Sequence, residues 1–354
     1  MVTVVREAKG WSQQELATHA HLSQGYVSKI ENGLLPLGGE VLEVVAKVLD
    51  CPTCLLLAER TVRGIEVTCL HHRRRRSKLG AAAVRKVEAT AHLSRLTVEA
   101  LLEGIEVGSV RALERLDDSA ASDPAGAAAR MRRRWEIPPG PIEDMVRLVE
   151  ALGVVVVLRS LGSHAQDAVS SWPQDGVHPA VMLMNAGQSP DRERFTLAHE
   201  LAHLLLHRVP GDDQEGEANK FAAAFLAPAD DIEPELRGLT TADLRRLLDL
   251  KARWKVSIGM LIQRAKDLDC ISERQFKEFR MKLTRLGWNV NEPVDLPIET
   301  PTLLARAISI QRSRGRTVDD LAAAALMTPA AFERHYLDTQ QMSAAEQLTV
   351  VRPL

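Results

Sequence analysis

Cysteine is scarce in this sequence: four cysteines in 354 residues are too few for a fold held together by disulfide bonds. Long apolar runs are also missing, since no stretch approaches the roughly 20 residues that cross a bilayer. The N-terminus lacks the basic-then-apolar pattern of a signal peptide. We therefore expect a cytoplasmic protein that does not enter a membrane.

Neither sign of charge is in excess, because 45 Lys and Arg residues stand against 47 Asp and Glu residues. With a net charge of -2, binding to nucleic acid cannot rest on overall charge and needs a local basic surface. Aromatic residues make up only 4% of the chain, whereas Ala, Leu, Arg and Glu are abundant. This composition favours a mainly α-helical fold.

The length predicts two or three domains, and composition divides the chain into five segments. Strand-like runs occur in only one of them, at 154–158 and 180–185, where short apolar stretches predict buried strands. We expect a small α+β domain there and helices elsewhere. The segments are 1–58, with short helices; 59–124, with the basic run 71–76 and a linker at 117–124; 125–235, with the strands; 236–290, helical; and 291–354, helical after a proline-rich start.

Two short helices near the N-terminus have the spacing of a helix-turn-helix. Ser12 and Glu15 form a capping-box pattern that starts a helix at 13–20. Ser23 caps a second helix at 24–31, which would lie in the major groove of DNA with its first residues against base edges. A helical interaction domain that never touches DNA is the alternative. The candidate DNA contacts are Gln13, Gln24, Gly25, Ser28 and Lys29.

Residues 10–17 (GWSQQELA) and 22–33 (LSQGYVSKIENG) resemble the XRE, or lambda-repressor-like, helix-turn-helix family. The resemblance covers nearly all of residues 1–58 and implies a five-helix DNA-binding domain. Because a single helix-turn-helix on one half-site binds weakly, we also expect a homodimer. Residues 317–333 have a similar helix-turn-helix spacing, but pairs of Ala-rich helices often show this pattern by chance. We therefore expect an ordinary helical bundle at the C-terminal end.

The sequence His199-Glu200-Leu201-Ala202-His203 lies in a helical segment that is apolar almost all round, which indicates burial. One helical turn holds 3.6 residues, so the two imidazoles share a face and can bind one cation. Burying two histidines and a glutamate without a function would be costly. The pattern predicts a Zn²⁺ site with Glu200 as general base, which takes a proton from water that attacks a polarised carbonyl.

A third protein ligand is needed, and the segment 215–222 is its obvious source. Glu215 is favoured over Glu217, because Asn219 lies four residues after Glu215 and can steady a histidine ligand. Glu217 stays as the alternative ligand. His207 either supports the site or is simply a satisfied histidine at the helix end. The group that would stabilise an oxyanion is left open among His164, His178 and His207.

Residues 194–207 (RFTLAHELAHLLLH) followed by 215–228 (EGEANKFAAAFLAP) resemble the ImmA/IrrE metallopeptidase family. The resemblance covers about 125–270 and implies a gluzincin-like endopeptidase with His199, His203 and Glu215 as zinc ligands. It also implies the substrate class: a repressor protein whose cleavage switches on stress-response or mobile-element genes. The order of modules is similar to that of one-chain actinobacterial regulators.

These resemblances give the five segments their expected identities: a DNA-binding domain, a basic helical linker region, a zinc peptidase domain, its helical extension and a C-terminal helical domain. The expected partners are DNA and a repressor protein, and no membrane. Two other functions stay open: a regulator whose peptidase-like domain senses a ligand without proteolysis, and an antitoxin-like repressor. The intact Glu200 speaks against the first, because a sensor needs no general base.

Overall fold

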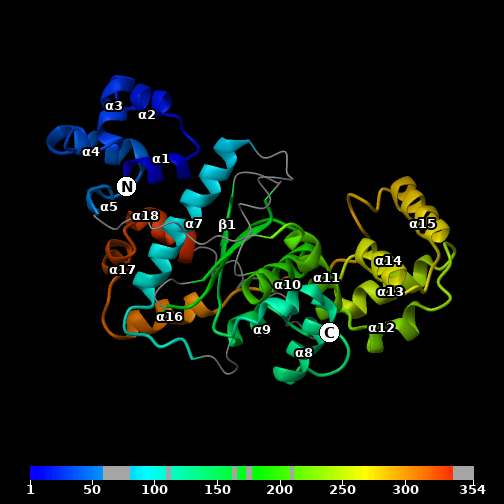
Figure 1. Ribbon diagram of the computed structural model, residues 1–354. Helices are drawn as coiled ribbons and strands as arrows, with labels where there is room; N and C mark the ends of the chain where they lie inside the picture. The colour runs from blue at the N-terminus through cyan, green and yellow to red at the C-terminus, as the bar shows by residue number, and fades with distance from the viewer. Residues whose placement is uncertain (59–79, 109–112, 162–165, 173–177, 208–210, 338–354) are drawn as a thin grey trace, which may run out of the picture. The chain divides into compact units, whose positions relative to one another are not determined.

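The computed structural model describes residues 1–58, 80–108, 113–161, 166–172, 178–207 and 211–337. Helices dominate these residues and three strands form one small sheet (Figure 1), which confirms the expected mainly α fold with a small α+β part. Among the described residues, no helix is both long enough and apolar enough to cross a membrane. The chain divides into two discontinuous compact units: Met1–Gly108 with Val154–Ala186 and Thr300–Leu354, and Ser109–Gly153 with Gly187–Glu299.

The N-terminal part of the first unit contains the five expected helices. The Ser12 hydroxyl accepts a hydrogen bond from the Glu15 backbone N–H, and the Glu15 carboxylate accepts one from Ser12 at 2.7 Å, so the capping box is confirmed. Ser23 caps the next helix through the backbone N–H of Tyr26. The helices are α1 (Val2–Ala8), α2 (Gln13–His19), α3 (Gln24–Glu31), α4 (Gly39–Leu49) and α5 (Thr53–Leu57).

One apolar face of each of these helices closes over a common core. Its members are small or branched aliphatic residues, so helices of only five to eleven residues can pack closely. Burial of this shared face, rather than local propensity, stabilises helices that are too short to persist alone. The core includes Val5, Leu16, Ala17, Ala20, Val27, Val45, Leu49 and Leu55.

The sheet of the first unit has the strand order β1-β3-β2, with β1 (Val155–Arg159), β2 (Ala168–Ser171) and β3 (Val181–Asn185). β1 runs parallel to β3, with Val155 opposite Val181, and β2 runs antiparallel to β3. The strands expected at 154–158 and 180–185 are confirmed to within one residue. β2 was not expected, because its sequence, Ala-Val-Ser-Ser, carries too few apolar residues to stand out.

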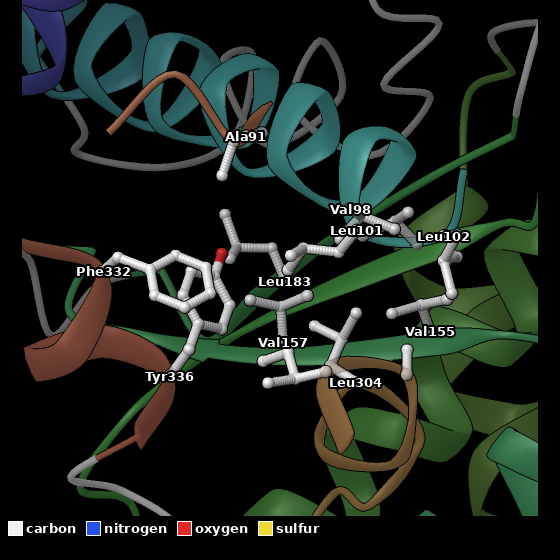
Figure 2. Close-up of a cluster of buried hydrophobic side chains, with 14 of the residues drawn as sticks. Ala91, Val98, Leu101, Leu102, Val155, Val157, Leu183, Leu304, Phe332 and Tyr336 are labelled. Carbon is white, nitrogen blue, oxygen red and sulfur yellow. The ribbon is translucent and has the colours of Figure 1, made fainter. Parts of the chain in front are cut away.

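A second core of the first unit joins the sheet to helices that are distant in sequence. Side chains of α7 (Ala81–Leu101) and α16 (Leu303–Ser313) meet β1 and β3 there, and Figure 2 shows Leu101, Val157 and Leu304 converging. Leu321 and Ala322 of α17 (Val318–Ala324) belong to the same core. Phe332 of α18 (Pro329–Phe332) and Tyr336 of the π-helical turn Glu333–Leu337 also pack into it.

The second unit is helical. The linker expected at 117–124 forms a 3-10 helix, Asp118–Ser122, in which Ala120 is buried. Asp123 then caps α8 through the backbone N–H of Gly126. The helices are α8 (Pro124–Arg134), α9 (Met145–Ala151), α10 (Pro190–Leu206), α11 (Gln214–Leu226), α12 (Ala229–Leu236), α13 (Leu244–Trp254), α14 (Ile258–Asp267) and α15 (Glu273–Leu286).

Buried cations tie the loops of the second unit to its helices. The Arg132 guanidinium on α8 donates to the carbonyls of Phe225, Pro138 and Gly140 at 2.7–2.8 Å, which holds the end of α11 and the Pro-Pro-Gly turn together. Arg194 on α10 pairs with Glu299 and donates to the Ile142 carbonyl. These contacts fix α10 and the end of α11.

The stability of the second unit is expected to fall as pH rises, because Glu193 on α10 titrates abnormally. Burial, reinforced by the Glu299 carboxylate, raises the pKa of Glu193 to about 7. The folded protein therefore holds a proton that the unfolded chain loses near pH 4.5, and the stability that this proton gives disappears as pH rises through 7. We expect Glu193→Gln to stabilise the protein at pH 8 by about 1–2 kcal/mol, after allowance for solvent screening.

Urea unfolding of the wild type and Glu193→Gln between pH 4.5 and pH 8 measures this effect. The difference between the two proteins should be smallest at pH 4.5 and grow toward pH 8. Glu278→Gln, on the exposed side of α15, is the matched control and should show no such trend. An equal difference at every pH would contradict the assignment of this titration to Glu193.

Candidate metal centre

The helix α10 carries the predicted motif and is buried along most of its length. Ser189 precedes it and Pro190 occupies its first turn, where proline costs no hydrogen bond. From Thr196 to Leu206 every residue is buried. Glu200 and His203 have no exposed surface, and His199 is 4% exposed. The two histidines and the glutamate therefore face other protein groups in the interior.

The helix α11 brings a carboxylate to the two imidazoles. His199 Nε2 and His203 Nε2 lie 3.0 Å apart. Glu215 in the first turn of α11 places one carboxylate oxygen 3.5 Å from His203 Nε2 and the other 3.7 Å from His199 Nε2. Among the described residues, this is the only group of three or more His, Cys, Asp or Glu side chains close enough to share a metal ion.

The donor set fits zinc. A tetrahedral zinc ion holds imidazole nitrogens and carboxylate oxygens at about 2.0–2.2 Å, which places neighbouring donor atoms about 3.3–3.5 Å apart. The three separations between donor atoms of this group, 3.0, 3.5 and 3.7 Å, bracket that range. Two imidazoles and one carboxylate also leave the fourth position of a tetrahedral site to water or substrate, which distinguishes a catalytic site from a structural one.

Each histidine of the group is oriented through its other ring nitrogen. His199 Nδ1 lies 3.0 Å from the Asn219 side-chain oxygen, in the supporting position expected for Asn219. His203 Nδ1 lies 2.7 Å from His207 Nδ1, and His207 Nε2 lies 3.0 Å from a Glu217 oxygen. With protons on the Nδ1 atoms of His199 and His203, both Nε2 lone pairs face the metal position, and each of these three supporting contacts has a donor and an acceptor.

Glu217, the alternative ligand, is not part of the three-residue group; its carboxylate supports His207 instead. Burial and the neighbouring Asp213 raise the pKa of Glu217, while Lys220 and His203 oppose the shift. Both ring nitrogens of His207 contact protein groups, so His207 is a poor candidate for stabilising an oxyanion. The sequence does not define the role of His207, because spacing along the helix does not show which group contacts its second ring nitrogen.

Two of the other histidines considered for the site are not placed in it. His164 lies outside the described residues, and His178 is described but does not belong to the three-residue group. Glu200 follows His199 directly on α10, so it leaves the helix about 100° round from that ligand. Glu200 does not belong to the group of His199, His203 and Glu215.

The predicted DNA-contacting residues lie on α2 and α3. Gln24, Gly25 and Lys29 are exposed, whereas Gln13 and Ser28 are half-buried. Gln24 donates to the Gln13 side-chain oxygen at 2.7 Å, so the two predicted contacts hold each other in place.

An ion pair that no sequence pattern predicted lies behind these residues. Glu31 accepts from Gln13 at 2.8 Å and pairs with the buried Arg6 at 2.6 Å. This chain of contacts ties α1, α2 and α3 together, so the exposed face of α3 is presented on a fixed support. Residues 71–76, the basic run, lie outside the described residues.

Comparison with known proteins agrees with both modules. Residues 5–56 match the helix-turn-helix family model, and residues 149–266 match a peptidase-family model described as the IrrE N-terminal-like domain. A 60-residue stretch, 16% of this chain, is 38% identical to the competence pilus inhibition repressor of Acinetobacter baylyi and spans 54%, about half, of that protein. The chain therefore combines a helix-turn-helix domain at residues 5–56 with an IrrE N-terminal-like domain at residues 149–266.

Proposed function

We propose that this chain is a DNA-binding regulator with a zinc-dependent endopeptidase site, and that it cleaves a repressor protein so that stress-response or mobile-element genes are expressed. The observation that carries the proposal is the grouping of His199, His203 and Glu215 beside the buried Glu200. The helix-turn-helix match and the similarity of one segment to a named repressor support a role in transcription regulation.

In this proposal the residues divide the chemistry between them. His199, His203 and Glu215 would hold zinc, which when bound would lower the pKa of water and polarise the carbonyl of the peptide bond to be cut. Glu200 accepts a proton as water adds to that carbonyl carbon. It then delivers a proton to the leaving amine nitrogen when the carbon–nitrogen bond breaks. Asn219 and His207 hold the ligand rings in the tautomer that binds metal.

The ligand assignment predicts different zinc affinities for three variants of α11. Glu215→Ala removes a ligand and should abolish retention of zinc. Asn219→Ala and Glu217→Gln remove supports of the two histidine rings and should each weaken zinc binding about 10- to 100-fold. Zinc affinity measured by competition with a coloured chelator checks all three, with Glu278→Gln on α15 as the control that should bind like the wild type. Retention by Glu215→Ala with loss in Glu217→Gln would reverse the assignment.

The function itself is tested with the full chain and repressor proteins encoded next to its gene. The purified protein should contain about one zinc ion per chain, by elemental analysis. It should cleave one such repressor, stop when a chelator removes the metal and resume when zinc is returned. Cleavage that continues without metal would exclude the proposed mechanism. Retained zinc with no cleavage of any candidate repressor would favour a regulator that senses a ligand without proteolysis.

A homodimer would strengthen the proposed DNA binding. One helix-turn-helix contacts one half-site, and two copies on neighbouring half-sites bind more tightly than one. We therefore propose that two chains bind a palindromic operator. Light scattering of the complex with a 30-base-pair duplex reports the number of chains, and a single chain per duplex at saturation would contradict this proposal.

A further inference from the structure

The C-terminal helices of the first unit repeat the geometry of the N-terminal helix-turn-helix. Each capping residue has a counterpart 305 positions further on: Ser12 and Thr317 cap the first helix of each pair, and both form complete capping boxes. Ser23 and Thr328 cap the second helix through the backbone N–H three residues later. Their backbone angles agree closely, with φ -80° and ψ 148° at Ser23 against -71° and 147° at Thr328.

The turns of the two motifs also correspond. Gly10 and Gly315, two residues before the first caps, have φ values of 76° and 91°. His21 and Leu326, two residues before the second caps, have φ values of 55° and 56°, a conformation that is uncommon without glycine. The same backbone hydrogen bond closes each inter-helix turn, at 2.9 Å in both motifs, and joins Leu22 to Ala17 and Met327 to Ala322.

Burial follows the same register in both motifs. In each motif, the residue four positions after the first cap is a buried leucine, and the residues five and eight positions after it are buried alanines. The residue four positions after the second cap is also buried and apolar in each motif. None of these side chains is more than 4% exposed. The matched pairs are Leu16 and Leu321, Ala17 and Ala322, Ala20 and Ala325, and Val27 and Phe332.

The exposed surface of the second motif is the more basic of the two. Residues 1–32 carry three basic and three acidic side chains, whereas residues 306–337 carry five arginines and three acidic side chains. Arg312, Arg314 and Arg334 are exposed, and Arg334 occupies the position of Lys29 in the first motif. Ala330 is exposed at the position of Gly25. A local excess of positive charge on a helix-turn-helix is complementary to a phosphate backbone.

Both motifs belong to one compact unit. α7 packs against α1 of the first motif and against α16 and α17 of the second. Arg85 of α7 pairs with Glu7, while the hydroxyl of Thr97, three turns further along the same helix, donates to the Ala325 carbonyl. The second motif is therefore held on the same support as the first.

We propose that residues 303–337 form a second DNA-binding helix-turn-helix, so that one chain contacts duplex DNA through two modules. The helical run that begins at Pro329 faces the duplex, as α3 does in the first motif. Arg334 and the exposed arginines that precede α17, Arg312 and Arg314, pair with phosphates. This second module goes beyond the single DNA-binding domain of the proposed function.

The repeat supplies matched variants for the test. Gly25→Glu and Ala330→Glu place the same negative charge at corresponding positions of the two motifs, and Lys29→Ala and Arg334→Ala each remove one positive charge. Ala252→Glu on α13 and Arg274→Ala on α15 make the same charge changes at exposed positions of the second unit and serve as controls. Binding of the full chain to a 40-base-pair duplex of random sequence is measured by fluorescence anisotropy over a range of salt concentrations.

Ala330→Glu is expected to weaken binding about tenfold or more, because it sets like charges against each other. Arg334→Ala is expected to lower the slope of log affinity against log salt by about 1, since one phosphate contact is lost. Gly25→Glu alone should leave measurable binding, and Gly25→Glu with Ala330→Glu should leave none. Thermal melting followed by circular dichroism confirms that each variant is folded.

Two results together would exclude the second module. Ala330→Glu and Arg334→Ala would bind with wild-type affinity and with the wild-type slope of log affinity against log salt, and Gly25→Glu would abolish binding. In that case the first motif alone contacts DNA, and the proposed DNA-binding function stands without this inference. If the wild-type chain binds no duplex at all, both the second module and the proposed DNA-binding function are overturned. The two failures are therefore distinguishable in one set of titrations.

Discussion

Glu200→Gln is expected to leave about one zinc ion per chain in place and to lower kcat/KM for cleavage of the repressor by about 10²- to 10⁴-fold. Glutamine has the shape of glutamate but cannot accept the proton of an attacking water. Because Glu200 is fully buried and lies outside the group of His199, His203 and Glu215, we expect its replacement by an isosteric neutral side chain to leave those three side chains undisturbed. The loss should appear in kcat rather than in substrate binding.

The matched control is Glu193→Gln, the same chemical change on the same helix, seven residues before Glu200. It should keep zinc and hydrolyse the repressor at close to the wild-type rate. Elemental analysis gives the zinc content, and gel-based kinetics give the cleavage rate. If Glu200→Gln keeps wild-type activity, another group supplies the general base and the proposed mechanism is wrong. If it loses zinc, Glu200 acts in binding the metal.

The second large effect is expected on stability, at the buried ion pair between Arg194 and Glu299. Arg194 is 2% exposed, and one guanidinium nitrogen donates to the Ile142 carbonyl at 2.6 Å. Glu299 accepts hydrogen bonds from the backbone N–H groups of Met145 and Val146, at 2.7 and 3.1 Å, and so holds the first turn of α9. Glu299, the last residue of the second unit, therefore links α10 to α9.

Arg194→Met is expected to lower the free energy of unfolding by about 3–5 kcal/mol, because it leaves the Glu299 charge buried without its partner. Burial already raises the pKa of Glu299, and Arg194 is the main opposing influence. Urea unfolding followed by the fluorescence of Trp135 and Trp254, both buried in the second unit, measures the loss.

The double variant Arg194→Met with Glu299→Gln separates charge from packing. It should recover part of the lost stability, since no unpaired charge is left in the interior, while the glutamine oxygen can still accept from the α9 backbone. A loss of less than 1 kcal/mol in the single variant would mean that water or another cation compensates Glu299. Equal losses in the single and double variants would mean that lost packing, not charge, is responsible.

Most of the correct predictions from the sequence came from patterns that span one or two turns of a helix. Capping residues and apolar spacing located α2 and α3 within a residue or two, because these signals act over one helical turn. The i and i+4 spacing of His199 and His203 placed both imidazoles on one face of α10 for the same reason. Asn219 lies where a support for a ligand was expected, since Glu215 and Asn219 are also one turn apart.

What the sequence could not predict depends on contacts between distant segments. The strands β1 and β3 share a core with α16 to α18, more than a hundred residues further on, so composition alone did not reveal the discontinuous units. The support of His203 runs through His207 to Glu217 on another helix, which spacing along α10 does not show. The sequence of residues 317–333 showed helix-turn-helix spacing, but its capping hydrogen bonds and turn angles are seen only in the structure.

The central proposal is that the site on α10 and α11 cuts a repressor. Intact-mass spectrometry of the repressor after incubation with the zinc-loaded wild type, beside Glu200→Gln, tests it most directly. We expect the wild type to yield two fragments whose masses sum to that of the repressor plus one water, and Glu200→Gln to leave the repressor whole. An uncut repressor in the presence of wild-type protein that holds one zinc ion per chain would contradict the proposal.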